Sequence, residues 1–158
     1  MHPSLYWFNL YVMKRALILN LIVLFFIALF GYAAFSKLAT YQVFETQLAQ
    51  SPFITGFASV IVWALPATEL LVAATLMAGI LKTTYLYIGM FGSLFLMAMF
   101  TSYIAMMLGF SFYIPCSCGG ILSKMSWTTH LFFNIFSTTL AIVALLLVPL
   151  VPQPVRSK

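Results

Sequence analysis

The stretch ALILNLIVLFFIALFGYAAFS, residues 16–36, holds no charged side chain, is preceded by Lys14 and Arg15, and is followed by Lys37. A helix needs about 20 predominantly apolar residues to cross the hydrocarbon core of a bilayer, and this stretch supplies that length. It exceeds the roughly 7–15 apolar residues of a secretory signal peptide, and no A-x-A cleavage site follows it. The stretch therefore predicts a retained membrane span.

The composition of the whole chain agrees with a membrane protein. Of its 158 residues, 64% are hydrophobic and 6% are charged, whereas a soluble domain carries about 25% charged residues. The net charge is +5, but the seven lysines and arginines flank apolar runs and form no patch. They are typical of topology signals and lipid-headgroup anchors, so we expect a bilayer and no nucleic acid as partner.

Three further apolar runs follow the first. They predict spans over about residues 53–81, 85–109 and 127–150, and hence an all-α, four-helix membrane bundle forming one domain over residues 1–158. Small residues in the third span allow close helix approach: Gly89, Gly92, Ser93, Ala98, Ser102 and Ala105. Polar residues in the fourth span are expected to form hydrogen bonds between helices: Asn134, Ser137, Thr138 and Thr139.

The two stretches that precede and follow the first span differ from it in character. Residues 1–13 are aromatic and nearly uncharged, which suits a membrane interface. Residues 38–50 predict a short amphipathic helix lying at the interface. The apolar residues of this second stretch recur at three- and four-residue spacing: Leu38, Tyr41, Phe44 and Leu48.

Four spans place both ends of the chain on one side of the membrane, and the basic residues indicate which side. With the ends inside, two basic residues are outside, Lys37 and Lys124, and five are cytoplasmic. The positive-inside rule favours this N-in, C-in orientation. The stretch 110–126, which holds both cysteines, is then extracytoplasmic, where disulfides form and persist. The five cytoplasmic residues are Lys14, Arg15, Lys82, Arg156 and Lys158.

The cysteines, Cys116 and Cys118, lie in PCSCGGIL at residues 115–122. Two thiols one residue apart close a disulfide only if the backbone turns tightly, because allowed Cα separations are about 4.4–6.8 Å. Gly119 and Gly120 give the chain that freedom. A small, strained, exposed disulfide tends to be labile and oxidising, so we expect a redox-active pair.

Nearby groups favour reactive thiols. Lys124 and the start of the fourth helix, capped by Ser126, both stabilise a thiolate. His130, one turn into that helix, is a candidate proton shuttle.

Other interpretations of Cys116 and Cys118 remain open. The two residues could instead be buried free thiols, form a purely structural disulfide, or bind a metal together with His130. A tetrahedral zinc site needs four ligands, and Cys116, Cys118 and His130 supply three with no fourth evident, so we expect no metal. Copper(I) would require methionine ligands, for which the candidates are Met106, Met107 and Met125.

Glu69 is the other candidate functional residue, in the middle of the second span and three residues after Pro66. A charged acid at this depth costs at least about 2.5 kcal/mol, and such residues usually face the bundle and have a function. One interpretation is a protonated side chain bonded to a carbonyl that Pro66 frees. The other is proton handling, or binding of the polar head of a lipid-soluble electron carrier. Lys37 would pair with Glu45 only if the chain bends between them.

Four features of the sequence, taken in order, together resemble one family. They are FGYAAFSKL at residues 30–38, the amphipathic stretch with Phe44 and Leu48, LPATELLVAATLMAG at 65–79 and PCSCGG at 115–120. This ordered set resembles the MauE (methylamine-utilisation) family, within the DoxX-like membrane proteins, over about residues 16–148. The resemblance matches Cys116 and Cys118 to the family's C-x-C pair and Glu69 to its P-x-x-E acid. The family's pair is usually followed by an aromatic residue and a glycine, whereas Gly119 and Gly120 follow here.

The resemblance implies an accessory protein of the bacterial inner membrane, associated with methylamine dehydrogenase maturation and a thioredoxin-like partner. We therefore expect a thiol–disulfide redox protein that passes electrons or disulfides between an extracytoplasmic protein and the membrane. The candidate cofactor is a membrane quinone, and whether the protein is a quinone-linked oxidoreductase stays open. The alternatives are a non-catalytic subunit or assembly scaffold, and a small-solute transporter. The expected working residues are Cys116, Cys118, His130 and Glu69.

Overall fold

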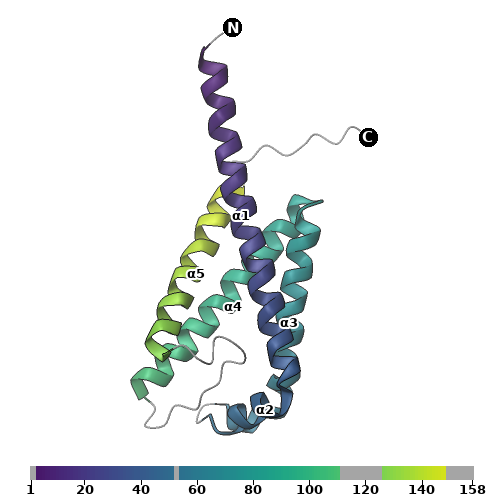
Figure 1. Cartoon of the computed structure of the whole chain (residues 1–158), viewed down its shortest axis with the longest axis vertical. Helices are drawn as coiled ribbons and strands as arrows, with labels where there is room; N and C mark the ends of the chain where they lie inside the picture. Colours follow the sequence, from purple (N-terminus) through teal and green to yellow (C-terminus); the bar gives the residue numbers. More distant parts are fainter. Residues whose placement is uncertain (1–2, 52–53, 111–125, 149–158) are drawn as a thin grey trace.

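The computed structural model describes residues 3–51, 54–110 and 126–148, and only the backbone of residues 3–11. Four helices of this part are long and apolar enough to cross a membrane, which confirms the predicted all-α, four-span fold (Figure 1). The elements in order are α1 (Pro3–Ala39), α2 (Tyr41–Ala49), the 3-10 turn η1 (Thr55–Phe57), α3 (Ala58–Gly79), α4 (Thr83–Phe110) and α5 (Trp127–Leu147).

The first helix is longer than the apolar run that predicts it. α1 begins at Pro3 rather than near residue 16, and its N-terminal turns project beyond the rest of the bundle (Figure 1). Proline is tolerated in the first turn of a helix because the N–H it lacks has no helical partner there. No glycine or second proline interrupts the chain before Gly31, so the helix continues without a break into the span.

The buried residues of the spanning helices repeat every three or four positions, which places them along one face of each helix. This is the spacing of helices that pack side by side with small crossing angles. On α3 the buried residues include Val62, Pro66, Glu69, Ala73, Leu76 and Gly79. On α5 they include His130, Asn134, Ser137, Ala141 and Ala144.

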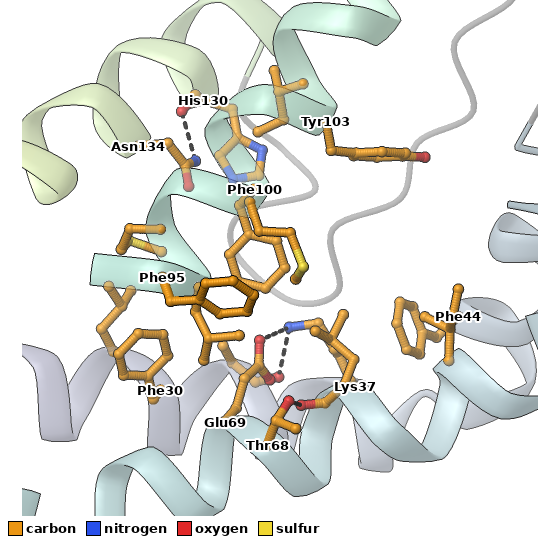
Figure 2. Close-up of a pocket in the computed structure, with 18 of the residues that line it drawn as sticks. Phe30, Lys37, Phe44, Thr68, Glu69, Phe95, Phe100, Tyr103, His130 and Asn134 are labelled. Carbon is orange, nitrogen blue, oxygen red and sulfur yellow. Dashed lines mark hydrogen bonds and ion pairs between the residues drawn. The ribbon is translucent and has the colours of Figure 1, made fainter. Parts of the chain in front are cut away.

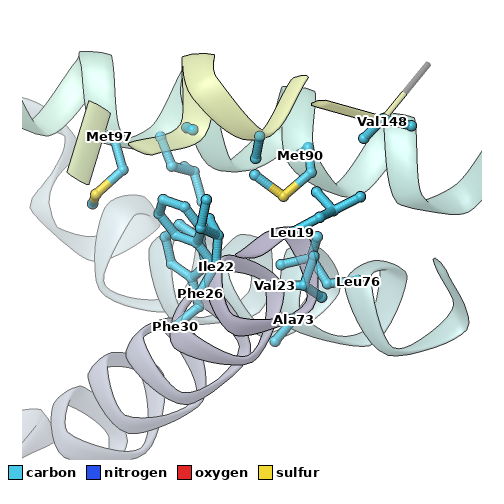
Figure 3. Close-up of a cluster of buried hydrophobic side chains, with 13 residues drawn as sticks. Leu19, Ile22, Val23, Phe26, Phe30, Ala73, Leu76, Met90, Met97 and Val148 are labelled. Carbon is cyan, nitrogen blue, oxygen red and sulfur yellow. The ribbon is translucent and has the colours of Figure 1, made fainter. Parts of the chain in front are cut away.

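The apolar core lies in the half of the bundle near the α3–α4 turn. There Leu19 and Phe26 of α1, Leu76 of α3 and Met90 of α4 form one buried cluster, which Val148 extends at the end of α5 (Figure 3). Large apolar side chains also cover the outside of the helices, such as Leu71, which is 67% exposed. Such a surface suits lipid, so the spanning helices contact the bilayer.

A second, smaller cluster lies at the opposite end. Phe44 and Leu48 of α2 are buried against Ala58 and Val62 of α3, so a helix is present within the predicted amphipathic stretch. At this end α4 runs toward the base of α5 and away from α3 (Figure 1). The α1–α3 pair and the α4–α5 pair are therefore farther apart here than in the core.

Close approach of α3 and α4 depends on glycine. A Cβ atom on Gly79 would lie 2.8 Å from the Cα of Leu86, and one on Gly89 would lie 2.7 Å from Leu76 Cδ2. Both distances are shorter than any ordinary carbon contact, so these positions allow the two backbones to meet.

We expect Gly79→Ala to destabilise the bundle by about 1–3 kcal/mol, because the new methyl group meets the backbone of Leu86. Thermal unfolding of the purified protein in detergent measures this. Gly31→Ala is the matched control, since a Cβ there meets nothing within 4 Å. Equal melting temperatures for the two variants would contradict the close packing of α3 on α4.

Candidate functional site

A buried ion pair joins α1 to α3. Lys37 Nζ lies 2.7 Å from Glu69 Oε1, and the two side chains are 13% and 1% exposed. Lys37 Nζ also donates to the carbonyl oxygen of Ala33 at 3.4 Å. Figure 2 shows the pair at the base of a cavity, with the carboxylate and the ammonium facing each other.

The sequence places both charges on the buried faces of their helices. Phe30, Ala34 and Lys37 follow one another at four- and three-residue spacing on α1, and the first two are fully buried. Glu69 has the same relation to Pro66 and Ala73 on α3. Because side chains at this spacing share one helix face, two antiparallel faces bring the charges together.

This geometry corrects three expectations. Glu69 bonds to the Lys37 ammonium, not to a backbone carbonyl freed by Pro66. Lys37 pairs with Glu69, not with Glu45, and it is largely buried rather than a headgroup anchor. The sequence signal for this burial is that Lys37 follows Phe30 and Ala34 at helical spacing, on the same buried face of α1.

The pair leaves hydrogen-bonding capacity unused. Within the described part of the chain, Glu69 Oε2 is buried and has no hydrogen-bond partner. The Lys37 ammonium lies 6.0 Å from the ring centre of Phe44 and 5.9 Å from that of Phe100. Such distances allow cation–π attraction, so one aromatic ring of α2 and one of α4 lie close to the charge.

A cavity of about 420 Å³ opens above the pair, between all five α-helices (Figure 2). Its volume lies within the range of about 300–1,000 Å³ that is typical of small-molecule sites. Its walls are mainly apolar and rich in phenylalanine, including Phe30, Phe95, Phe100 and Phe133. The polar side chains that line it are those of Lys37, Thr68, Glu69, Tyr103, His130 and Asn134.

The α5 wall of this cavity begins at a capped helix start. The Thr129 N–H donates to Ser126 Oγ at 3.2 Å, as expected for an N-cap. His130 follows in the first turn, is 8% exposed and lines the cavity. Asn134 Nδ2 donates to the His130 carbonyl oxygen at 2.9 Å. The structure thus brings the predicted residues Glu69 and His130 to one cavity.

The other polar residues of α5 bond mostly within the helix. Ser137 and Thr139 donate to the carbonyl oxygens of Phe133 and Ile135. Thr138 also lies 3.3 Å from Thr101 of α4, so one contact of the predicted kind joins two helices. The hydroxyl of a serine or threonine within a helix finds its nearest acceptor four residues back along the same helix, which explains the difference.

The cysteines fall outside the described residues, as do Lys124 and Met125. The segment that holds them leaves α4 after Phe110 and meets α5 at Ser126 and Trp127, and Trp127 itself lines the cavity. Of the other predicted copper ligands, Met107 is fully buried whereas its neighbour Met106 is 44% exposed, so the two side chains take different surroundings.

Four apolar spans around a cavity with a buried ion pair define a multi-pass membrane protein. The family model described as methylamine utilisation protein MauE matches residues 15–147. The chain belongs to the MauE family, as the sequence resemblance predicts. Neither the curated proteins nor the solved structures gave a match.

We expect Lys37→Met alone to lower the free energy of unfolding by about 3–5 kcal/mol, because it leaves a buried carboxylate without its partner. The double variant Lys37→Met/Glu69→Met should recover most of that loss, since apolar side chains of similar volume replace a buried pair with little penalty. Thermal unfolding in detergent measures both.

Lys82→Met is the control for loss of a lysine, because Lys82 is exposed in the α3–α4 turn. Its effect should stay within about 0.5 kcal/mol. A single Lys37 variant as stable as this control would show that the pair is not formed.

Proposed function

We propose that the protein is a membrane thiol–disulfide redox protein in which Cys116 and Cys118 exchange a disulfide with an extracytoplasmic protein. One observation carries the proposal: the ends of the cysteine segment, Phe110 and Ser126, belong to the end of the bundle where the cavity lies. Trp127 and His130 of α5 and Tyr103 of α4 line that cavity. The helix ends that flank Cys116 and Cys118 in the sequence thus line the cavity, which supports the proposal.

The proposed orientation has both chain ends in the cytoplasm. Five basic residues are then inside and Lys37 and Lys124 are outside. Lys37 is 13% exposed and lies inside the bundle against Glu69, so it does not count as a loop residue, and the comparison becomes five against one. The stronger bias supports an extracytoplasmic cysteine segment, and we propose the bacterial inner membrane as its location, with residues 1–158 as one membrane domain.

The proposed exchange begins when a thiolate of the partner attacks the Cys116–Cys118 disulfide and forms a mixed disulfide. A second thiol of the partner displaces the bound cysteine, which leaves the partner with a disulfide and this chain with two thiols. Two electrons and two protons have then passed to Cys116 and Cys118. A membrane quinone that takes up both restores the disulfide, and His130 and Glu69 are the proposed proton carriers.

The family name gives the pathway that we propose. The family description names methylamine utilisation. The partner that we propose, as the resemblance implies, is a thioredoxin-like protein or a disulfide-rich protein such as methylamine dehydrogenase during its maturation. We also propose the wider DoxX-like group as the setting of this fold. In the competing proposal, the chain is a non-catalytic scaffold that holds such a partner through its helices.

Single replacements of either cysteine should trap the partner. With Cys116→Ser or Cys118→Ser, the remaining thiolate can still attack the disulfide of an oxidised partner, which is the reverse of the exchange above. This chain then has no second thiol to release the partner, so a larger species should appear on a non-reducing gel and vanish on reduction. The double serine variant is the control and should trap nothing. If neither single variant traps a partner while the protein is normally abundant in the membrane, the exchange proposal fails and the scaffold stands.

Labelling of intact cells tests the orientation. A membrane-impermeant maleimide should label Cys116 and Cys118 after mild reduction. In a cysteine-free background, Lys82→Cys in the exposed α3–α4 turn should be labelled only after the membrane is opened. The reverse pattern would place the thiols in the cytoplasm and end the proposal.

A further inference from the structure

The cavity contains the charged pair of Lys37 and Glu69, although apolar side chains of similar volume would stabilise the fold equally well. Lys37 and Glu69 are 13% and 1% exposed and are surrounded by phenylalanine rings. The pair is electrically neutral as a whole, so it would not attract a free cation or anion strongly. A ligand that suits this site is neutral and carries a polar group that reaches both partners.

The unused hydrogen-bonding groups define that polar group. The described contacts use Glu69 Oε1 and leave Glu69 Oε2 buried without a partner. An ammonium has three N–H donors, and those of Lys37 have two acceptors in the described structure, Glu69 Oε1 and the Ala33 carbonyl. The site therefore offers one donor and one acceptor side by side.

A single oxygen that changes between carbonyl and hydroxyl fits both groups. As a carbonyl it accepts from the Lys37 ammonium, and as a hydroxyl it donates to Glu69 Oε2. An acyl chain would leave both groups unpaired, which is unfavourable for buried polar atoms. A small ammonium ion would be repelled by Lys37.

The walls suit a flat ring with an apolar tail. Phe95 and Phe100 lie between the ion pair and His130 in the view of Figure 2, and aromatic rings pack well against one another. Phe95 is 64% and Met99 is 40% exposed, and both also line the cavity. Since the outer surface of α4 faces lipid, a lipid-soluble molecule has a route from the bilayer beside these residues.

We propose that this cavity binds the ring of a membrane quinone, and that Lys37 and Glu69 hold one of the ring's oxygen atoms. The electron-transfer role of the quinone rests on the proposed function, whereas its binding rests on the cavity alone. In the reaction, two thiols of Cys116 and Cys118 become one disulfide. The two electrons and two protons that they lose convert the quinone into a hydroquinone.

Quinone binding is measurable on the purified full-length protein in lipid nanodiscs. Titration with a para-benzoquinone that carries a decyl tail should quench tryptophan fluorescence saturably, because Trp127 lines the cavity. Decylbenzene, which has the tail and ring but no oxygen, should neither bind with comparable affinity nor displace the quinone. Equal competition by decylbenzene would show a cavity for lipid chains only and overturn the proposal.

The double variant Lys37→Met/Glu69→Met should weaken quinone binding about ten-fold or more, because hydrogen bonds to charged groups contribute affinity of that order. Lys82→Met should bind as the wild type does. Unchanged affinity in the double variant would remove the pair from the site. If that variant does not fold, photolabelling of the wild type with an azido-quinone decides: label on the cavity-lining parts of α1, α3 or α4 supports the proposal, and label elsewhere only overturns it.

The two proposals fail in different ways. If the wild-type protein binds the quinone but the single-cysteine variants trap no partner, the binding-site proposal stands and the thiol–disulfide proposal fails. If the single-cysteine variants trap a partner but the wild-type protein binds no quinone, the exchange proposal stands and the binding-site proposal fails.

Discussion

The contact between Lys37 and Glu69 is the constraint on which the rest of the site depends. Each charge alone would be strongly unfavourable in the interior of a membrane protein, and together they are tolerated because they lie 2.7 Å apart. The contact fixes the register of α1 against α3. It also sets the last turns of α1 beside the middle of α3, since Lys37 lies close to the end of its helix.

That register explains why a cavity exists at this end of the bundle. α1 ends at Ala39, so the first turns of α3 lie beside α2, whose Phe44 and Leu48 cover Ala58 and Val62. The α4–α5 pair diverges from α1 and α3 toward the same end (Figure 1). The core near the α3–α4 turn is tightly packed through glycine, whereas the opposite half retains about 420 Å³ of space.

The proposed chemistry draws on this asymmetry. Thiol exchange needs access to a protein outside the membrane, whereas a quinone needs an apolar site open to lipid. A bundle that is tightly packed in one half and contains a cavity in the other allows thiol exchange and quinone binding to take place at the same end. In this proposal the fold supplies the scaffold and a few polar residues supply the function.

The sequence by itself determined the number of spans, the family and two polar residues of the site. The number of spans follows from the number and length of the apolar runs, which can be read directly from the sequence. Glu69 and His130 stand out because polar side chains are energetically costly within a span and usually have a function there. The partner of Lys37 was decided only by the tertiary structure. Glu45 is near it in sequence, but Glu69, 32 residues away, meets it because two helices pack antiparallel in one register. The cavity likewise depends on how the helix pairs diverge, which no local pattern encodes.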